Sequence, residues 1–465
     1  MLNYKDCLRY NQYMKVNEEY IAKIEKLTNE GVGIARVDNC VVFIENTCPE
    51  DEIKFKITKV NKSFAQGQIV EIITPSQHRV KPFCPMYNAC GACQLQFIDY
   101  EYQLQVKQEI TQDAMDRIGG LNIKVKSTIP SPEQNKYRHK VQYPVSRTKN
   151  SGRILAGYYK PKTHEIVNIK YCPIQPAICD NIINFIREKA FDFGVQGFFE
   201  KNHSGDLRHI VLRISAYNGK ILVVLVVNAT KIFDRLKDFA KCIYDEFDEV
   251  VGVCVNYNSK KTNVILGNKT ECICGQDYVE EKLLDKVFKI GVSTFFQVNP
   301  KSAENIFKYV KEYLKDNFES PIVLDAYAGI SSFGICVSDV CKKVVTVEEN
   351  KESCDKAREV IQTNRIKNVE IHNMDAAKFF AKEKRKFDAI ILDPPRKGCT
   401  KESLDEAIRL TNNTIIYVSC NPATLARDLK YLTEHGFVVE SVQPFDMFCH
   451  TYHVENVAIV RRMEI

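Results

Sequence analysis

The sequence predicts an α/β protein whose C-terminal part is a doubly wound, Rossmann-like domain. Apolar, β-rich runs at 321–325, 343–347 and 387–392 each predict a buried strand, and each is followed by an acid or a tight turn. Helix-forming segments separate these runs, and this alternation predicts a parallel sheet with helices on both faces. We therefore expect polar ligands at the carboxyl edge of the sheet, where open α/β sheets bind them.

Composition limits what the chain can be. A length of 465 residues suggests about three domains, and a hydrophobic fraction of 45% is enough to build their cores. The formal charge of +6 permits a polyanionic partner without requiring one. The longest apolar run, 221–227, is too short to cross a bilayer, and no signal-peptide core follows Met1 to Lys5. We expect a cytoplasmic monomer without a membrane partner, whose 18 cysteines are reduced or bind metal.

Residues 1 to about 80 predict a small β-barrel. Short β-like segments follow one another between glycine turns such as Gly31 to Gly33, which is typical of small barrels. Four lysines would give this barrel a basic side. The ordinary interpretation is a solvated lysine face, and the alternative is an RNA-binding barrel of the oligonucleotide-binding (OB) type. The lysines are Lys54, Lys56, Lys59 and Lys62.

Three cysteines lie close together in the central part, residues 81–290, which we expect to be an α+β domain. Cys84, Cys90 and Cys93 have the spacing C-x5-C-x2-C, which is typical of a metal site. A four-thiolate zinc or iron–sulfur site needs a fourth ligand. Cys172 is the first candidate, because it also lies in a Cys-Pro loop, and Cys179 is the second. The spacing differs from the C-x3-C-x2-C of radical enzymes and does not distinguish zinc from iron.

The remainder of the central part alternates between helix and strand signals. A helix is predicted at 97–118, ended by Gly119 and Gly120. Further on, basic residues are interleaved with aromatic ones, a pattern that suits single-stranded RNA, whose bases stack on rings. An ordinary strand with a solvated face explains the same pattern equally well. These residues are Lys136, Tyr137, Arg138, His139, Lys140, Tyr143 and Arg147.

Acids follow successive strands of the C-terminal part, residues 291–465. Glu348 lies about twenty residues after the turn of the first strand, the spacing at which an acid binds ribose hydroxyls. Asp375 follows a candidate strand at 369–372, and Asp393 follows the strand at 387–392. Each acid alone is weak evidence, but three successive strand ends with acids or turns predict a nucleotide-like ligand.

Cys420 lies where a fourth strand ends. The run 415–418 is apolar and β-rich, and Pro422 prevents the strand from continuing into a ladder. A helix can begin at Ala423, so the thiol stands on the turn at the carboxyl edge. A lone cysteine is usually a small buried hydrophobe. A thiol at this edge is nevertheless a candidate nucleophile, because it is partly ionised near its reference pKa of roughly 8.5.

Several stretches resemble known proteins. Residues 17–76 resemble the TRAM domain, a small RNA-binding barrel. Nearly the whole chain resembles the RNA (uracil-5-)-methyltransferases, most closely the branch that acts on bacterial 23S ribosomal RNA. The stretches that carry this resemblance are FFQVNP (295–300), DPPRKGC (393–399), SCNPATLARDL (419–429) and HVENVAIV (453–460). The chain departs from the family at Ala328 and at Ser331-Ser332, where the family usually has Cys-Gly-x-Gly-Thr.

The resemblance implies a function and a set of site residues. It implies methylation of C5 of a uridine in 23S rRNA, with Cys420 as the nucleophile that adds to C6 and Glu455 as the proton acceptor. It implies that the helix at 97–118 packs on the catalytic domain. It implies S-adenosyl-L-methionine contacts at Gln297, Tyr327, Ser332, Glu348, Asp375 and Asp393. It implies a [4Fe-4S] cluster on Cys84, Cys90, Cys93 and Cys172.

The chemistry explains why such a site needs these residue types. C5 of uracil is a poor nucleophile until a thiolate adds to C6, after which C5 can take a methyl group and must then lose its proton. Glu455 stands between apolar strand residues, and desolvation raises a carboxyl pKa toward useful basicity. Arg396 follows Asp393-Pro394-Pro395, where enzymes that methylate exocyclic nitrogens have an aromatic residue, so we expect it to contact the base, a phosphate or the catalytic carboxylate.

Three other functions are compatible with parts of this pattern. A transfer RNA uridine-C5 methyltransferase would use the same mechanism. A radical thiomethylating enzyme would also combine a TRAM domain with an iron–sulfur cluster, but the cysteine spacing and the doubly wound domain argue against it. A non-catalytic RNA-binding or redox-sensing iron–sulfur protein would not need the intact SCNP and HVEN stretches.

Overall fold

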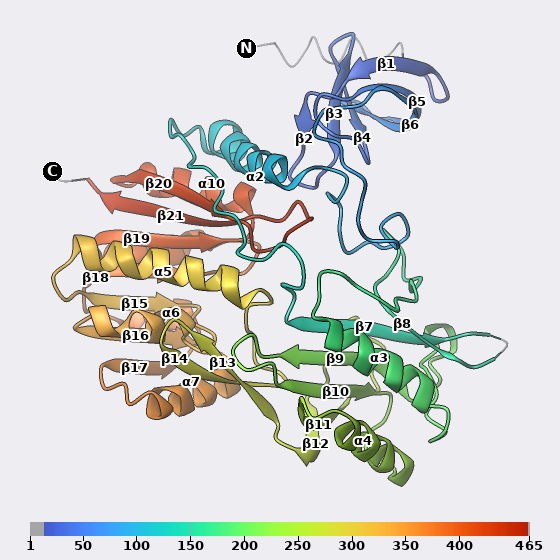
Figure 1. Cartoon of the computed structure of the whole chain (residues 1–465). Coiled ribbons are helices and arrows are strands. Elements are labelled where there is room, and N and C mark those ends of the chain that lie inside the picture. Colours follow the sequence, from blue (N-terminus) through green and yellow to red (C-terminus); the bar gives the residue numbers. More distant parts are fainter. Residues whose placement is uncertain (1–13, 150, 464–465) are drawn as a thin grey trace.

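The computed structural model describes residues 14–149 and 151–463, so the expectation about a signal peptide at Met1 to Lys5 lies outside the described residues. The described residues form three sheets of six, six and seven strands and one two-stranded hairpin (Figure 1). Among the described residues, no helix is both long and apolar enough to span a membrane.

The first sheet is small and strongly curved. Its six strands have the order β1-β5-β6-β4-β3-β2 and enclose a core of side chains such as Val42, Ile44, Ile53 and Phe55. It lies at one end of the molecule in Figure 1, next to helix α2. The strands are β1 (Glu19–Lys23), β2 (Lys26–Leu27), β3 (Gly33–Val37), β4 (Cys40–Ile44), β5 (Glu52–Val60) and β6 (Ala65–Thr74).

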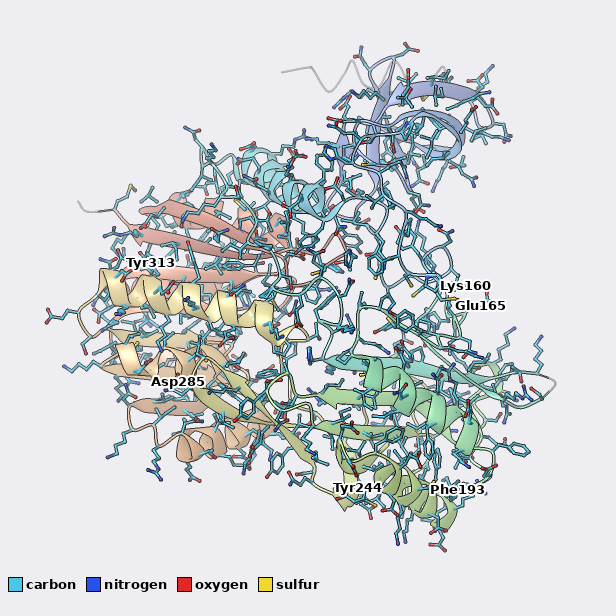
Figure 2. The ribbon with its side chains drawn as sticks, viewed as in Figure 1. Lys160, Glu165, Phe193, Tyr244, Asp285 and Tyr313 are labelled. Carbon is cyan, nitrogen blue, oxygen red and sulfur yellow. The ribbon has the colours of Figure 1, made fainter. Side chains whose placement is uncertain are left out.

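The second sheet has the order β12-β11-β10-β9-β7-β8. Its central strand β10 has the sequence ILVVLVV and is buried throughout, because both faces of the sheet are covered. One face packs under α3 and α4, where Phe193 and Tyr244 are labelled in Figure 2. The elements are β7 (Lys140–Arg147), β8 (Ile154–Ala156), α3 (Ala177–Lys189), η2 (Glu200–Asn202), β9 (Leu207–Ile214), β10 (Ile221–Val227), α4 (Asp234–Glu246), β11 (Val250–Tyr257) and β12 (Lys269–Gly275).

The other face of β10 joins the core of the C-terminal sheet. Leu222, Val224 and Val226 belong to the same apolar cluster as Phe307 of α5 and Val323 of β15. The hairpin of β13 (Tyr278–Leu283) and β14 (Lys286–Gly291) contributes to that cluster as well. The central and C-terminal parts therefore share one core, and strand β10 stabilises both.

The third sheet has the order β17-β16-β15-β18-β19-β21-β20. Helices cover both faces, as predicted: α5, α6 and α7 pack on one side, and α8, α9 and α10 on the other. The elements are α5 (Pro300–Asn317), β15 (Ile322–Ala326), α6 (Ser332–Cys336), η3 (Ser338–Val340), β16 (Lys343–Glu348), α7 (Lys351–Thr363), β17 (Val369–Asn373), α8 (Ala376–Lys382), β18 (Phe387–Leu392), α9 (Lys401–Leu410), β19 (Thr411–Ser419), α10 (Pro422–Thr433), β20 (Phe437–Phe445) and β21 (Glu455–Arg462).

The prediction of a parallel sheet is confirmed from β15 to β19 but is wrong at β21. This strand runs antiparallel to both of its neighbours, β19 and β20. The physical reason is the connection 446–454, which contains no crossover helix and so returns the chain in the opposite direction. Tyr313, labelled in Figure 2, shows how α5 crosses this sheet, since its hydroxyl donates to Glu440 of β20 at 3.5 Å.

The helix predicted at 97–118 is α2 (Tyr100–Ala114), which continues into a π-helical turn, η1 (Met115–Gly119). Asp99 caps its start by accepting from the backbone N–H of Tyr102 at 2.8 Å, and Gly120 ends it with φ 62°. Although α2 lies early in the chain, it packs against α10 and β20 (Figure 1).

Candidate active site

Four neighbouring parallel strands end at the same edge of the third sheet. In spatial order these strands are β16, β15, β18 and β19, and the chain reverses its winding between β15 and β18. Such a switch point leaves a crevice at the carboxyl ends. Glu348 ends β16, Tyr327 follows β15, Asp393 follows β18 and Cys420 follows β19.

The turn after β15 is tightly wound. Tyr327, Gly329 and Ser331 all have left-handed backbone, with φ of 63°, 56° and 58°. Ser331 thus adopts a conformation that glycine takes more easily, at the position where a nucleotide-binding loop usually has glycine. Its buried hydroxyl bonds the Thr346 hydroxyl at 3.0 Å, which holds the turn against β16. Ser332 then begins α6.

The predicted strand-end acids are held in place by backbone donors. Glu348 accepts from the N–H of Gly329 at 2.9 Å and from that of Asn350 at 2.7 Å. Asp375 caps α8 by accepting from Lys378 at 3.1 Å. These bonds fix the two carboxylates at the edge and leave lone pairs for a ligand.

Asp325 is a site residue that sequence reasoning missed. Its side chain is fully buried in β15, and one oxygen accepts from the Gly334 N–H at 2.8 Å, while the other has no partner among the described residues. Burial, with the charges of Asp393 and Glu348 adding to it, raises the pKa of Asp325 to about 7. Burial also raises the pKa of Asp393 to about 7. The position of Asp325 near the end of strand β15 was the signal in the sequence that could have identified it as a site residue.

These acids suit a cationic ligand. Two carboxylates with raised pKa values, one of them with an unpaired buried oxygen, would be stabilised by a nearby positive charge. S-adenosyl-L-methionine carries such a charge on its sulfonium, so the residues fit it. Tyr327, whose hydroxyl donates to Ser403 at 3.3 Å, lies at the same edge. Gln297 lies elsewhere, before α5, where it lines a small cavity with His139, Lys140 and Arg213.

Cys420 and Glu455 are brought together by strand register. Ser419, the last residue of β19, lies opposite Asn456 of the antiparallel strand β21. Cys420 and Glu455 are each one residue further toward the same end, on the opposite face from that pair. Cys420 is half-buried, whereas Glu455 is only 8% exposed. The two predicted catalytic residues are therefore neighbours in space.

Arg396 joins this pair. Burial and the negative charge of Glu455 raise the pKa of Cys420, and a hydrogen bond and the charge of the Arg396 guanidinium oppose that rise. Burial and Asp393 raise the pKa of Glu455 well above its ordinary value, again opposed by Arg396. Burial lowers the pKa of His453 to about 4, with the charge of Arg396 adding to that effect, so this imidazole is neutral at physiological pH. The charge of Arg396 thus partly offsets the rise in the pKa of both Cys420 and Glu455.

The loop that carries Arg396 is anchored to α10. The backbone oxygen of Arg396 accepts from Asn421 and Thr424, both at 3.2 Å. Asp428 accepts from the N–H of Cys399 at 2.9 Å and from Tyr417 at 2.5 Å. The DPPR turn therefore has a fixed position relative to Cys420, which lies just before the same helix.

The four predicted cysteine ligands line one small cavity. Cys84, Cys90, Cys93 and Cys172 all face it, whereas Cys179 is not among its lining residues. A single zinc ion would hold its thiolates about 2.3 Å from one point. Among the described residues, no group of three or more histidine, cysteine or acidic side chains is arranged so that it could hold a metal ion. The four thiols are of the donor type that zinc and iron–sulfur sites use.

Comparisons with known proteins agree with this geometry. The family described as tRNA (uracil-5-)-methyltransferase matches residues 99–463, and the TRAM domain matches residues 14–70. An uncharacterised RNA methyltransferase of Oceanobacillus iheyensis is 37% identical over 95% of this chain and 96% of its own length. One of Clostridium tetani is 36% identical over 96% of this chain and 97% of its own.

A solved structure is similar over almost the full length. The tRNA (uracil-54, C5)-methyltransferase of Pyrococcus abyssi, in complex with S-adenosyl-L-homocysteine, superposes with a TM-score of 0.75 and 26% identity. The match covers 95% of this chain and 100% of that chain.

We predict that Arg396→Gln moves the ionisation of Cys420 to higher pH, because the guanidinium that lowers the thiol pKa is lost. The measurement is the rate of iodoacetamide alkylation of the Cys420 peptide against pH, followed by mass spectrometry. Lys397→Gln removes the same charge from the next, exposed residue and should leave the profile unchanged. An unshifted profile in Arg396→Gln would contradict the assignment.

Proposed function

The chain belongs to the tRNA (uracil-5-)-methyltransferase family, and from this premise we propose that it methylates C5 of a uridine in 23S ribosomal RNA through a covalent bond between Cys420 and C6. S-adenosyl-L-methionine is the methyl donor, and it supplies an electrophilic methyl group on a sulfonium. The observation that carries the proposal is the meeting of Cys420, Glu455 and Arg396 at the carboxyl edge of the sheet.

Each of the three residues has one task. The Cys420 thiolate adds to C6 and leaves C5 electron-rich, so that C5 can take the methyl group. Glu455 then removes the C5 proton, and the electrons of that C–H bond expel the thiolate. A buried carboxylate with a raised pKa is a stronger base than an exposed one, which suits this step. Arg396 stabilises negative charge on Cys420 before addition and on Glu455 before proton removal.

We propose that the strand-end residues hold the donor. Glu348 and Asp375 are preorganised by their backbone hydrogen bonds, while Asp393 and Tyr327 lie on the neighbouring strand ends. Ser332 begins the helix after the wound turn. Gln297, just before α5, would provide the sixth contact of this set.

We propose that Cys84, Cys90, Cys93 and Cys172 hold a [4Fe-4S] cluster. Burial raises the pKa of Cys93 and Cys172 to about 12, so these thiols become thiolates only beside a strong positive charge such as a metal provides. Their place around one cavity supports a cluster. The proposal that the substrate is rRNA rests on the resemblance of the barrel and the cysteine site to the branch of the family that acts on ribosomal RNA.

Transfer RNA is the second candidate substrate. It is favoured by the similarity to the Pyrococcus abyssi enzyme, which is a tRNA (uracil-54, C5)-methyltransferase. We further propose that the chain has three domains, at 1–80, 81–290 and 291–465. Helix α2 lies in the second range but packs on the third domain. An RNA substrate of this kind would place the enzyme in the cytoplasm, where we propose that it acts as a monomer.

We predict that a deletion strain lacks 5-methyluridine at a position in 23S rRNA, as mapped by mass spectrometry of digested rRNA and tRNA. Wild-type enzyme should restore the modification, and Cys420→Ala should not. A loss confined to tRNA would replace the rRNA proposal by the tRNA one, and an unchanged pattern in both RNAs would contradict the function.

We predict that anaerobically purified protein is brown and contains about four irons and four sulfides per chain, as four thiolate ligands imply. Serine at any of Cys84, Cys90, Cys93 or Cys172 should abolish the visible absorbance. Cys179→Ser is the matched control and should keep it, because Cys179 does not line the cavity. Zinc as the sole metal would show the cluster assignment to be wrong.

We predict that Glu455→Gln forms a methylated covalent RNA adduct that does not resolve, because addition and methyl transfer precede proton removal. The adduct should appear as a slow band on a denaturing gel, labelled from the donor. Cys420→Ala should give neither adduct nor product. Turnover should fall by about 10²–10⁴-fold in Glu455→Gln.

Glu440→Gln, on the exposed face of β20, and Cys242→Ala on α4 are controls for these two changes and should behave as wild type. Normal turnover by Glu455→Gln would require another base, and activity of Cys420→Ala would exclude the covalent route.

A further inference from the structure

Helix α2 carries polar side chains on the face that it buries. Gln103, Lys107 and Thr111 are spaced four residues apart and so lie in one row along the helix. Their exposed fractions are 1%, 0% and 0%. Burying polar groups, above all an ammonium, is costly unless each finds a partner. The hydrogen-bond partners of these three side chains therefore explain why α2 has polar residues on its buried face.

Lys107 binds the start of the connection between β20 and β21. Its ammonium donates to Asp446 at 2.6 Å and to the backbone oxygen of Phe448 at 3.0 Å. The second oxygen of Asp446 accepts from the Tyr100 hydroxyl at 2.8 Å. Although burial acts to raise the pKa of Asp446, Lys107 and these hydrogen bonds hold it below its ordinary value. Asp446 is thus ionised, and both side chains of the ion pair are fully enclosed.

The other two members of the row bind the middle and the end of the same segment. Gln103 accepts from the backbone N–H of His450 at 3.1 Å. The Thr111 hydroxyl lies 3.1 Å from the side-chain oxygen of Asn456 and 3.0 Å from the backbone oxygen of Lys107, between which its one hydrogen is shared. Asn456 directly follows Glu455 and lies opposite Ser419. One helix face therefore fixes the segment 446–456 at three points, the last of them next to Glu455.

The cysteine loop holds this segment from a second side. The backbone N–H groups of Gln94 and Leu95, just after Cys93, both donate to the backbone oxygen of His450 at 2.9 Å. Gln103 also donates to the backbone oxygen of Leu95 at 3.1 Å. The segment that carries Glu455 is consequently clamped between α2 and the loop of the four-cysteine site.

We propose that Gln103, Lys107 and Thr111 are positioning residues for Glu455, and that they act on proton removal rather than on thiolate addition. The proposal rests on Glu455 being the base, as argued above. Glu455 is positioned by the ladder of β21 with β19 and β20 and by this segment, which directly precedes it, whereas Cys420 is placed by β19 and by the cap of α10. A small displacement of the segment would move the base away from C5 and leave the nucleophile where it is.

The test compares two threonines that both bond to α2. Thr111→Val removes the hydroxyl that contacts Asn456 and that also bonds the backbone oxygen of Lys107. Thr128→Val is the matched control, because its buried hydroxyl likewise donates to a backbone oxygen of α2, that of Leu104 at 2.8 Å, and makes no hydrogen bond to 446–456 among the described residues. Single-turnover reactions with labelled donor separate two rates on denaturing gels: formation of the covalent adduct and its decay to product.

We expect Thr111→Val to slow adduct decay by about threefold to tenfold, the size of one buried hydrogen bond, and to leave adduct formation unchanged. With uridine deuterated at C5, the isotope effect on decay should be larger in Thr111→Val than in wild type, because proton removal becomes more rate-limiting. Thr128→Val should alter neither rate nor the isotope effect. Lys107→Met should slow decay by about tenfold or more, since it removes two contacts.

Three outcomes would overturn the proposal: equal losses in formation and decay, an unchanged decay rate in Thr111→Val, or the same change in Thr128→Val. If Lys107→Met fails to fold, the two threonine variants decide alone. Glu455→Gln is run in parallel. If it accumulates no adduct, the proposed catalytic role of Glu455 fails. If it does and Thr111→Val behaves as wild type, only the positioning role fails.

Discussion

The antiparallel insertion of β21 between β19 and β20 is the constraint on which the candidate site depends. A parallel strand in that place would present its carboxyl end at the edge, and its first residue would lie at the far side of the sheet. Because β21 runs the other way, its first residue, Glu455, meets the residue that follows β19, Cys420. Two groups that are 35 positions apart thus become neighbours through backbone hydrogen bonds alone.

Electrostatics at this edge follow from desolvation. Asp325, Asp393 and Glu455 all have pKa values raised by burial, and for Glu455 the charge of Arg396 opposes that rise. Such a site is short of positive charge until a cationic ligand arrives. A sulfonium supplies that charge beside the acids and becomes neutral when its methyl group leaves. The same acids that favour the donor would therefore bind the neutral product less tightly.

Much of the site could be predicted from the sequence because strand ends are local signals. The positions of Glu348, Asp393 and Cys420 followed from apolar runs and the turns after them, and the family resemblance assigned roles to them. Ser331 was a recognisable departure, and the structure explains it: the left-handed turn is kept and its hydroxyl bonds Thr346. What the sequence did not reveal is long-range. The reversed direction of β21, the hydrogen bond from Arg396 to Cys420, and the buried row on α2 all depend on contacts with no local periodicity.

Helix α2 shows why such contacts matter for catalysis. A helix chosen for stability alone would bury apolar side chains on this face, and a buried ion pair is weak evidence for stability. The Lys107–Asp446 pair is instead well suited to specificity of position, because both ions need one another and tolerate little displacement. A carboxylate that is to remove a proton directly must be held within hydrogen-bond reach of it. Helix α2 lies more than 300 positions before the segment that it holds. The N-terminal half of the chain therefore helps to position Glu455 in the C-terminal sheet.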